Sequence, residues 1–292
     1  MVLWKDYHLA HSIGDALETL AHAPGLARLI AGGTDLLLDL QQGRHPPVHT
    51  LVDVSAVTEM NVIEIRQERL YIGAALPLNR IVASPLVQEH AVALVEAAGL
   101  IGGPQVRNTA TLGGNVAHAL PAGDGTIALL SLDAQAEIVD LKGKRLLPLE
   151  DLFLGPGRSA LLPQGELLVA FHLPLRSPYE GSAFRRIMRP QGVAIAILNL
   201  SAWVKRRGEV IEAVRLALGP AGPKPRRCRE TEQVLQGKPL NASILEQAYE
   251  SLIREVSFRT SPHRATAEYR RHMAGVLLSD VLKTAWVRAA GE

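Results

Sequence analysis

Cysteine is almost absent from the sequence, because Cys228 is the only one in 292 residues. A single thiol excludes an internal disulfide and cannot supply the cysteine ligands of an iron–sulfur cluster within this chain. The neighbouring Arg226, Arg227 and Arg229 could lower its pKa, but we expect a surface thiol without a role. The ten histidines are scattered, so we expect no metal site built by the protein itself. Redox chemistry would therefore need an organic cofactor or a group in another chain.

An excess of charge and a long apolar run are also lacking. Lys and Arg total 31 against 29 for Asp and Glu, so nothing indicates a nucleic-acid surface, and we interpret the basic pieces 205–207 and 224–229 as a solvated turn and loop. No stretch approaches the roughly 18 uninterrupted apolar residues of a membrane span. The first residues lack the charged-then-apolar pattern of a signal peptide. We therefore expect a cytoplasmic protein, long enough for two domains.

Two short glycine-pair motifs are present instead. One is Thr111–Asn115 (TLGGN), which closes a run of turn-forming and polar residues that begins at Gly102. The other is Ala31–Asp35 (AGGTD), directly after the mostly apolar run 26–30. Adjacent glycines let the backbone approach a bulky anion and adopt positive φ, and successive amide N–H groups form an anion-binding nest. Either motif alone is typical of a plain turn, but the pair indicates one long phosphate-bearing ligand held at two points.

The two motifs together resemble those of a known family. Ala31–Asp35 followed by two leucines, and Thr111–Asn115 with Asp124 nine residues on, resemble the FAD-binding medium subunits of the molybdenum hydroxylases. That family includes carbon monoxide dehydrogenase, xanthine dehydrogenase and 4-hydroxybenzoyl-CoA reductase. The resemblance extends from Tyr7 to the segment 269–272, which is nearly the whole chain.

The resemblance implies an α+β fold. Residues 1–175 would form a two-subdomain FAD-binding domain of the vanillyl-alcohol oxidase type, with subdomains at about 1–55 and 56–175. Residues 176–292 would form a small C-terminal domain with a three-stranded sheet and helices. The sequence itself disfavours a Rossmann nucleotide site, because no GxGxxG motif follows the first strand.

Local patterns predict the elements around the motifs. The first 35 residues indicate a β-α-β unit with Ser12 as the helix N-cap, and residues 87–98 have the periodicity of one helix. The second glycine motif is predicted to lie in a loop that opens at Gly99. After a hairpin at 137–148 and a change of composition at 174–180, we expect strands at 183–188, 193–204 and 210–218, then helices at 229–235, 240–254 and 264–288.

The resemblance also implies the cofactor site. FAD would be bound without a covalent link, and the chain itself would hold no catalytic residue and no metal. The implied cofactor-binding residues are Ala31, Gly32, Gly33, Thr34, Asp35, Ile101, Thr111, Leu112, Gly113, Gly114, Asn115, Asp124, Leu168, Arg185 and Arg186. Asp124 would either cap the helix 126–132 or contact the polyol or phosphate region of the flavin. Ile101 would pack near the ring and the Leu168 backbone would meet it, although core burial explains both side chains equally well.

The sequence departs from the family at two places. Where the family commonly has a lysine after an aromatic residue, Phe184 is followed by Arg185 and Arg186. Alternate strand residues face opposite ways, so either arginine could keep a positive charge near the flavin. Arginine does not act as a proton donor, so proton-coupled steps could differ. The cysteine-bearing insertion of 4-hydroxybenzoyl-CoA reductase is missing between residues 115 and 124, and the extra cluster is expected to be missing with it.

By resemblance, the chain is an electron-transfer flavoprotein subunit. A large partner would hold the molybdenum cofactor, and a small partner with two [2Fe-2S] clusters would pass electrons to FAD for transfer to an acceptor. Two such heterotrimers could pair as a dimer. Two alternatives stay open. One is a self-contained flavin oxidoreductase of the same fold, which we disfavour because no obvious base lies beside the glycine motifs. The other is a nucleotide-binding accessory protein without redox chemistry.

Overall fold

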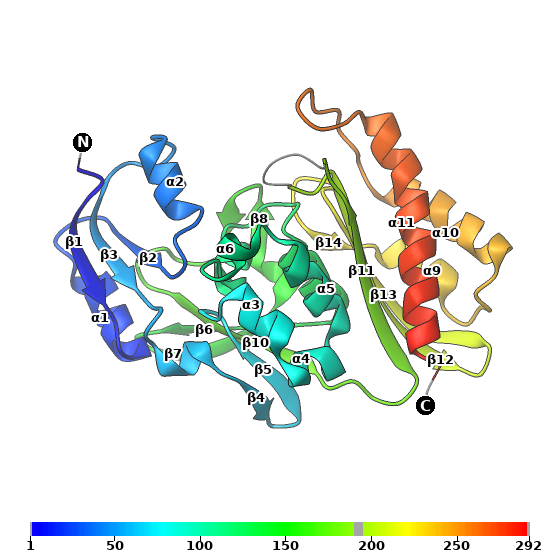
Figure 1. The fold of residues 1–292 in the computed structure, drawn as a ribbon, viewed down its shortest axis with the longest axis horizontal. Helices are drawn as coiled ribbons and strands as arrows, with labels where there is room; N and C mark the ends of the chain where they lie inside the picture. Colours follow the sequence, from blue (N-terminus) through cyan, green and yellow to red (C-terminus); the bar gives the residue numbers. More distant parts are fainter. Residues whose placement is uncertain (1, 190–194, 291–292) are drawn as a thin grey trace.

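The structure is a computed structural model that describes residues 2–189 and 195–290. Within these ranges the chain forms three larger sheets, which follow one another along the long axis of the molecule (Figure 1). Parallel and antiparallel sheets occur together with helices, so the predicted α+β class is confirmed.

The first sheet is small and parallel, with the strand order β1-β3-β2. Its elements are β1 (Trp4–Leu9), α1 (Ile13–His22), β2 (Ala27–Ile30), α2 (Leu36–Gln41) and β3 (Val48–Asp53). The predicted β-α-β start is confirmed, because the Ser12 hydroxyl accepts a hydrogen bond from the Asp15 N–H (3.1 Å) and caps α1. The first glycine motif thus connects the end of β2 to the start of α2.

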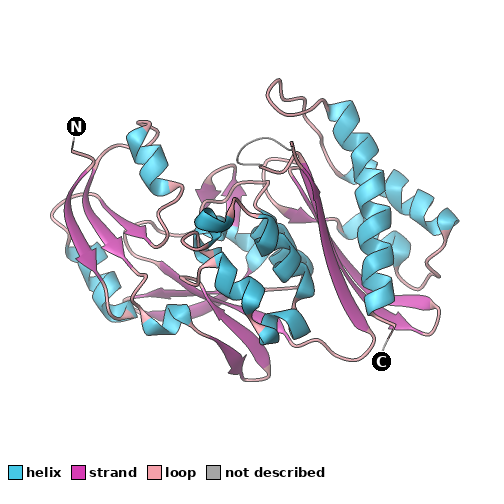
Figure 2. Cartoon of the chain, in the orientation of Figure 1, coloured by secondary structure: helices cyan, strands magenta, loops and turns pink. Residues whose placement is uncertain are grey.

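The second sheet is antiparallel, with the order β4-β5-β10-β6-β7. Its strands are β4 (Ile63–Arg66), β5 (Arg69–Gly73), β6 (Gln135–Asp140), β7 (Gly143–Pro148) and β10 (Leu167–Pro174). Between β5 and β6 the chain forms α3 (Leu78–Ala83), α4 (Pro85–His90), α5 (Val92–Leu100), α6 (Pro104–Arg107), α7 (Leu112–Ala117) and α8 (Asp124–Ser131). Two short strands, β8 (Phe153–Gly155) and β9 (Arg158–Ser159), pair with each other. Figure 2 shows that these short helices gather in the middle of the molecule, between the second sheet and the third.

The third sheet is antiparallel, with the order β11-β12-β13-β14. It comprises β11 (Glu180–Ile187), β12 (Leu198–Arg207), β13 (Val210–Gly219) and the two-residue β14 (Arg226–Arg227). The helices α9 (Arg229–Leu235), α10 (Ala242–Glu255) and α11 (Ala267–Arg288) follow. The long α11 contacts β11 and β12, while α5 and α8 also pack on strands of this sheet. The predicted three strands and three helices are confirmed, except that residues 193 and 194 lie outside the described residues and β14 was not expected.

The single helix predicted over 87–98 is wrong. The chain breaks at Ala91, whose φ of −143° and ψ of 49° are not helical, so α4 and α5 are separate. The spacing of apolar residues does not reveal this break. Because α5 is buried on several sides between α3, α8 and β11, apolar residues occur all around it, and the pattern looks continuous across Ala91. After this break, α5 packs against β11.

The expectation of a surface thiol is also wrong. Cys228 is fully buried in the core between the third sheet and its helices. Burial raises the pKa of its thiol well above the usual range, and the neighbouring arginines do not reverse this shift. The residue is part of the packing and is not a reactive group.

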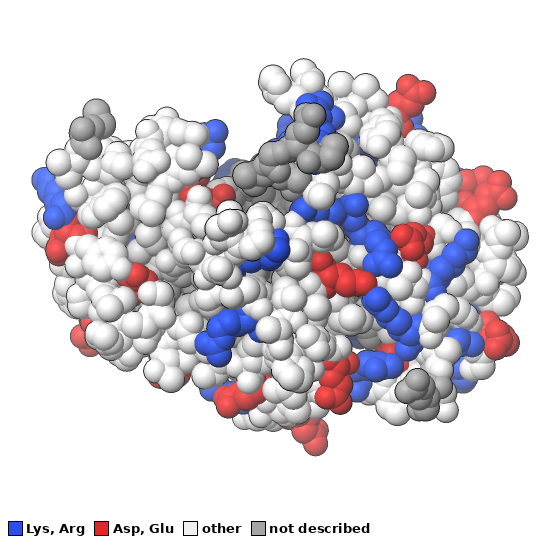
Figure 3. Space-filling view, viewed as in Figure 1, with Lys and Arg blue, Asp and Glu red and all other residues white. Residues whose placement is uncertain are grey.

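The surface carries both signs of charge. On the face seen in Figure 3, basic and acidic side chains lie beside one another, most densely over the part formed by the third sheet and α11. The same view shows an indentation at the upper edge, between the lobe that carries α2 and the rest of the molecule. Among the described residues, no helix is long and apolar enough to cross a membrane.

Candidate functional site

The first glycine motif is built for close backbone contact. Gly33 has a φ of +67°, in the left-handed region that favours glycine. A Cβ at Gly32 would lie only 2.0 Å from the carbonyl oxygen of Thr109 and 2.7 Å from its carbon. Only glycine therefore permits this contact. It places the first motif directly against the residues that precede the second motif, although the two are about eighty positions apart in the sequence.

The first motif also offers hydrogen-bond donors. Among the described residues, none accepts a hydrogen bond from the main-chain N–H groups between Ala31 and Leu36, and the first bond after them runs from the Leu37 N–H to the Gly33 carbonyl (3.0 Å). The side chains of Thr34 and Asp35 are exposed. Successive free N–H groups around a left-handed glycine form an anion-binding nest. The predicted nest at this motif therefore fits a phosphate group.

The second glycine motif differs from its prediction. It lies in the first turn of α7, and neither Gly113 nor Gly114 has a positive φ. The Thr111 hydroxyl accepts from the Gly114 N–H (3.0 Å) and so caps the helix. The N–H groups of Leu112 and Gly113 donate to carbonyls of Leu76 (3.3 Å) and Ala74 (2.8 Å). The amides of this motif are therefore used within the protein, and the second nest is not formed.

The two glycines of α7 have different surroundings. A Cβ at Gly113 would lie 2.5 Å from the Ala74 carbonyl oxygen, so this glycine lets α7 pack on the segment after β5. Gly114 is exposed, and a Cβ there would meet only the Thr111 hydroxyl, at 3.1 Å. Gly114 thus presents bare backbone to the outside of the helix, where a ligand can approach closely.

Asn115 connects α7 to the start of α8. Its side-chain oxygen accepts a hydrogen bond from the Thr126 N–H at 3.3 Å. A Cβ at Gly125 would lie 2.9 Å from that oxygen, so the loop before α8 is packed tightly against the amide. None of the described residues accepts from the Asn115 amide nitrogen, which remains available as a donor.

Asp124 is the centre of a buried polar group. It is the first residue of α8 and Gly123 is the N-cap, so the interpretation of Asp124 as the cap is wrong. Its two carboxylate oxygens accept from the Arg186 guanidinium (2.5 Å) and from the Asn199 amide (2.6 Å). Both charged side chains are only 5% exposed. Burial raises the pKa of the Asp124 carboxyl, and the attraction of Arg186 and the hydrogen bonds from Asn199 and Arg186 act against that shift.

The two arginines of β11 face different neighbours. Arg186 also donates to the carbonyl of Leu100, at the end of α5 and next to Ile101. Arg185 lies between α5 and α11, where it pairs with Glu96 (3.0 Å) and Asp280 (3.1 Å). The structure therefore places Arg186 with Asp124 and Ile101, and it places Arg185 in a separate ion-pair network. Figure 1 shows that β11 passes beside the central helices over this length.

Ile101 and Leu168 belong to the wall of the same region. Ile101 is the half-buried residue that ends α5, and it packs against the main core. Leu168 is buried in β10, just before a bulge opposite β6. The carbonyl of the next residue, Val169, accepts from the Ala74 N–H at 2.8 Å, on the segment that supports Gly113. Both side chains are thus explained by packing, and flavin contact at either position stays a prediction.

Sequence reasoning missed Asn199, which binds Asp124 from β12. Its amide nitrogen also reaches the Ala122 carbonyl (3.2 Å), while its side-chain oxygen and the Arg186 Nε are buried without a partner among the described residues. No local pattern marks Asn199, because only the packing of β12 on α8 brings it near Asp124. Buried polar atoms without partners are unusual, and here they occur beside the glycine motifs.

Comparison with known families matches both parts of the chain. Residues 4–176 match the family described as the FAD binding domain in molybdopterin dehydrogenase. Residues 182–285 match the family described as the CO dehydrogenase flavoprotein C-terminal domain.

Individual relatives agree with these matches. The chain is 34% identical, over 99% of its length and 98% of the other, to a xanthine dehydrogenase FAD-binding subunit from Escherichia coli O157:H7. It is 30% identical to the carbon monoxide dehydrogenase medium chain of Hydrogenophaga pseudoflava, covering 98% of both chains. Its fold matches a solved carbon monoxide dehydrogenase of H. pseudoflava with a TM-score of 0.92 at 28% identity, covering 98% of both chains. Quinoline 2-oxidoreductase from Pseudomonas putida 86 is similar with a TM-score of 0.88 at 26% identity, again over 98% of both chains.

Proposed function

Because the chain belongs to the family of FAD-binding subunits of molybdenum hydroxylases, we propose that it transfers electrons from the [2Fe-2S] clusters of a partner to an external acceptor. The chain is an oxidoreductase subunit, and its cofactor is FAD. The observation that carries the proposal is the run of free N–H groups between Ala31 and Leu36, held against the segment that precedes α7.

The residues present fit this cofactor. We propose that the N–H groups from Ala31 to Leu36 bind a phosphate, and that the bare backbone at Gly114 and the amide of Asn115 contact the same ligand. Bound FAD supplies the exchange between two-electron and one-electron chemistry. Arg186 and Asn199 hold the Asp124 carboxylate in one position, so the site beside α8 has no free negative charge to repel the phosphates.

The partners follow from what this chain cannot hold. Cys228 is the only cysteine and is buried, so clusters with cysteine ligands must belong to another subunit. No group of three or more metal-ligating side chains occurs among the described residues. We propose a large subunit with the molybdenum cofactor and a small subunit with two [2Fe-2S] clusters, with two heterotrimers pairing as a dimer. We place the boundary of the FAD-binding domain near residue 175, where the chain leaves β10 for β11.

We expect the purified protein to release FAD, and not FMN, on denaturation. The chain offers no thiol for a covalent link, because Cys228 lies in the core behind the third sheet. The first glycine motif lies against the residues directly before the second, and two such neighbouring motifs suit a dinucleotide better than a mononucleotide. Acid or heat release followed by chromatography measures this. Recovery of FMN alone, or flavin that stays with the precipitate, would contradict the expectation.

We expect the isolated subunit to turn over no organic substrate. Asp124, the buried carboxylate beside the second glycine motif, is engaged by Arg186 and Asn199, so we do not expect it to act as a base. Stopped-flow bleaching of the flavin should be recorded with purines, aldehydes and aromatic acyl-CoA thioesters, with and without the two partner subunits. Bleaching should require both partners. Rapid bleaching of the lone subunit by an organic substrate would favour a self-contained flavin oxidoreductase, and absence of flavin bands would favour a nucleotide-binding accessory protein.

A further inference from the structure

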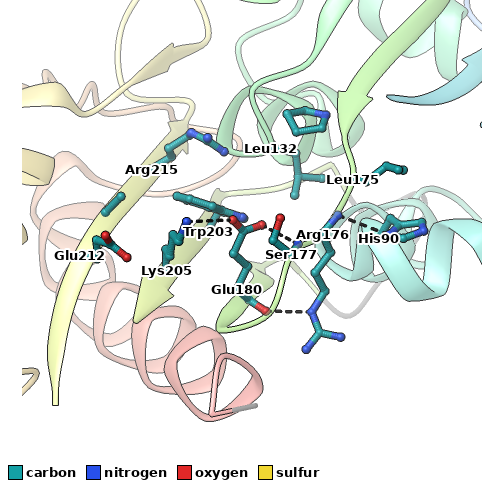
Figure 4. Close-up of a pocket in the computed structure, with 12 residues that line it drawn as sticks. His90, Leu132, Leu175, Arg176, Ser177, Glu180, Trp203, Lys205, Glu212 and Arg215 are labelled. Atoms are coloured by element: carbon teal, nitrogen blue, oxygen red, sulfur yellow. Dashed lines mark hydrogen bonds and ion pairs between the residues drawn. The ribbon is translucent and has the colours of Figure 1, made fainter. Parts of the chain in front are cut away.

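A cavity of about 380 Å³ lies away from the glycine motifs, beside the segment that joins β10 to β11. Its walls come from three places: the ends of α4 and α8, the connecting segment, and the outer halves of β12 and β13. Figure 4 shows Trp203 and Lys205 on one strand with Arg215 on the next, the Glu180 carboxylate beside Lys205, and the Arg176 guanidinium pointing away from Arg215. The volume lies in the range of small-molecule sites.

Arg215 is a half-buried cation in the wall of this cavity. Its guanidinium carbon lies 3.8 Å from the centre of the Trp203 ring, so the cation is stacked and held in place. It makes no hydrogen bond with any described residue, and its nearest carboxylate oxygen, on Asp133, is 3.9 Å away. The other Asp133 oxygen pairs with Arg227 at 3.3 Å. Burial lowers the pKa of Arg215, as expected for a desolvated cation with a weak partner.

Two further cations line the same cavity. Lys205 lies on the same sheet face as Arg215, because Trp203 pairs with Arg215 across the ladder and Lys205 pairs with Ala213. Its ammonium is 3.9 Å from Glu180, too far for a good hydrogen bond. The Arg176 guanidinium donates to the carbonyl oxygens of Glu180 (2.8 Å) and Arg288 (3.1 Å). Its charge therefore has no carboxylate partner among the described residues.

The acidic residues approach two of these cations only at 3.9 Å, Glu180 beside Lys205 and Asp133 beside Arg215. Glu180 and Glu212 are the two carboxylates of the lining, against three cations at Arg176, Lys205 and Arg215. One Glu180 oxygen accepts from the Ser177 N–H at 3.0 Å. A second cavity of about 320 Å³ shares Trp203, Ala213 and Arg215. There, by contrast, Arg227 is paired with Glu232 and Arg229 with Glu150. Arg176, Lys205 and Arg215 therefore have weaker carboxylate partners than Arg227 and Arg229, or none among the described residues.

We propose that the first cavity binds an oxyanion, the phosphate or carboxylate group of a small metabolite, between Arg215 and Lys205. Arginine presents a planar set of donors that matches both groups, and the Trp203 stack fixes that set before the ligand arrives. The ligand would touch the FAD-binding domain at His90 and Leu132, and the C-terminal domain at β12 and β13. Binding would therefore hold the two domains together at a distance from the flavin motifs.

The test uses the protein saturated with FAD, so that added anions do not compete for the first glycine motif. Isothermal titration calorimetry with inorganic phosphate and with citrate, at constant ionic strength, should show one site for at least one of them. Arg215→Met should weaken that binding at least tenfold. Lys205→Met should weaken it as well, and because the Lys205 side chain is 38% exposed this variant should fold as the unchanged protein does. Arg207→Met, at the exposed end of the same strand, is the matched control and should bind as the unchanged protein does.

The outcomes distinguish a phosphate ligand from a carboxylate ligand, and both of these from failure of the proposal. Tighter binding of phosphate identifies a phosphorylated ligand, and tighter binding of citrate a polycarboxylate. The proposal is overturned if neither anion binds, or if Arg215→Met and Lys205→Met bind as tightly as Arg207→Met, since any binding would then lie outside this cavity. Flavin content, measured on each sample, should stay the same in all three variants, which keeps this result independent of the flavin site.

Discussion

Gly114→Val is expected to leave the protein folded but almost free of FAD. Gly114 lies on the exposed side of α7, and a Cβ there would meet only the Thr111 hydroxyl, at 3.1 Å. Valine in a helix costs less than about 1 kcal/mol relative to the best helix former, and glycine is itself a poor one. The branched side chain would, however, occupy the space through which the ligand reaches the backbone. Flavin content by absorbance should fall to a small fraction of its normal value.

Two other glycines provide the controls for this result. Gly32→Val should unfold or strongly destabilise the protein, by about 3 kcal/mol or more, because its Cβ would lie 2.0 Å from a carbonyl oxygen of the main chain. Gly165→Val should change nothing, because no atom lies within 4 Å of a Cβ there. Circular dichroism melts and flavin content should be measured on the same samples. Equal flavin content in Gly114→Val and Gly165→Val would show that the outer side of α7 is not the ligand side.

The first glycine motif shows what the sequence can predict. An apolar run, two glycines and a short helix follow one another, and each signal acts over a few residues. The structure has β2, the left-handed Gly33 and α2 in that order. Local patterns suffice here because strand, turn and helix start are each determined by neighbouring residues.

The second motif shows where local reasoning stops. The pattern threonine, leucine and two glycines was interpreted as an open loop, but Thr111 begins a helix by capping the Gly114 N–H. The same residues are compatible with an anion-binding nest and with a capped helical turn. Threonine is a good N-cap, and glycine adopts both positive φ and helical φ. Contact with Ala74 and Leu76 decides between them. That contact depends on β5, some forty residues earlier in the chain.

The polar group around Asp124 could not be predicted for a related reason. Its members come from α8, β11 and β12, and they meet only when the third sheet packs on the central helices. The sequence indicated Asp124 and the two arginines through family resemblance, but it could not say which arginine meets Asp124. The strand register answers that question, since neighbouring residues of β11 point to different neighbours.

Arg186→Met is expected to destabilise the protein by about 3 to 5 kcal/mol at neutral pH. It would leave the Asp124 carboxylate buried without its cation, and an unpaired buried charge carries a cost of that size. Arg185→Met is the matched control on the same strand. Its side chain is 33% exposed and its partner Asp280 is 50% exposed, so we expect a loss of about 1 kcal/mol or less. Chemical denaturation monitored by circular dichroism measures both losses.

The pH dependence of the Arg186→Met variant identifies the cause of its loss. Burial already raises the pKa of the Asp124 carboxyl, and Arg186 opposes the shift, so removing Arg186 should raise that pKa further. A carboxyl whose pKa is higher in the folded than in the unfolded state contributes stability below the unfolded value, and this contribution is lost as pH rises through the folded value. The deficit of Arg186→Met should therefore shrink as the solution is acidified from neutral pH. Adding Asp124→Asn to the variant should remove this dependence, because no charge remains to be protonated. A deficit that stays constant with pH, or that equals the deficit of Arg185→Met, would mean that the loss does not come from leaving the Asp124 carboxylate without its cation.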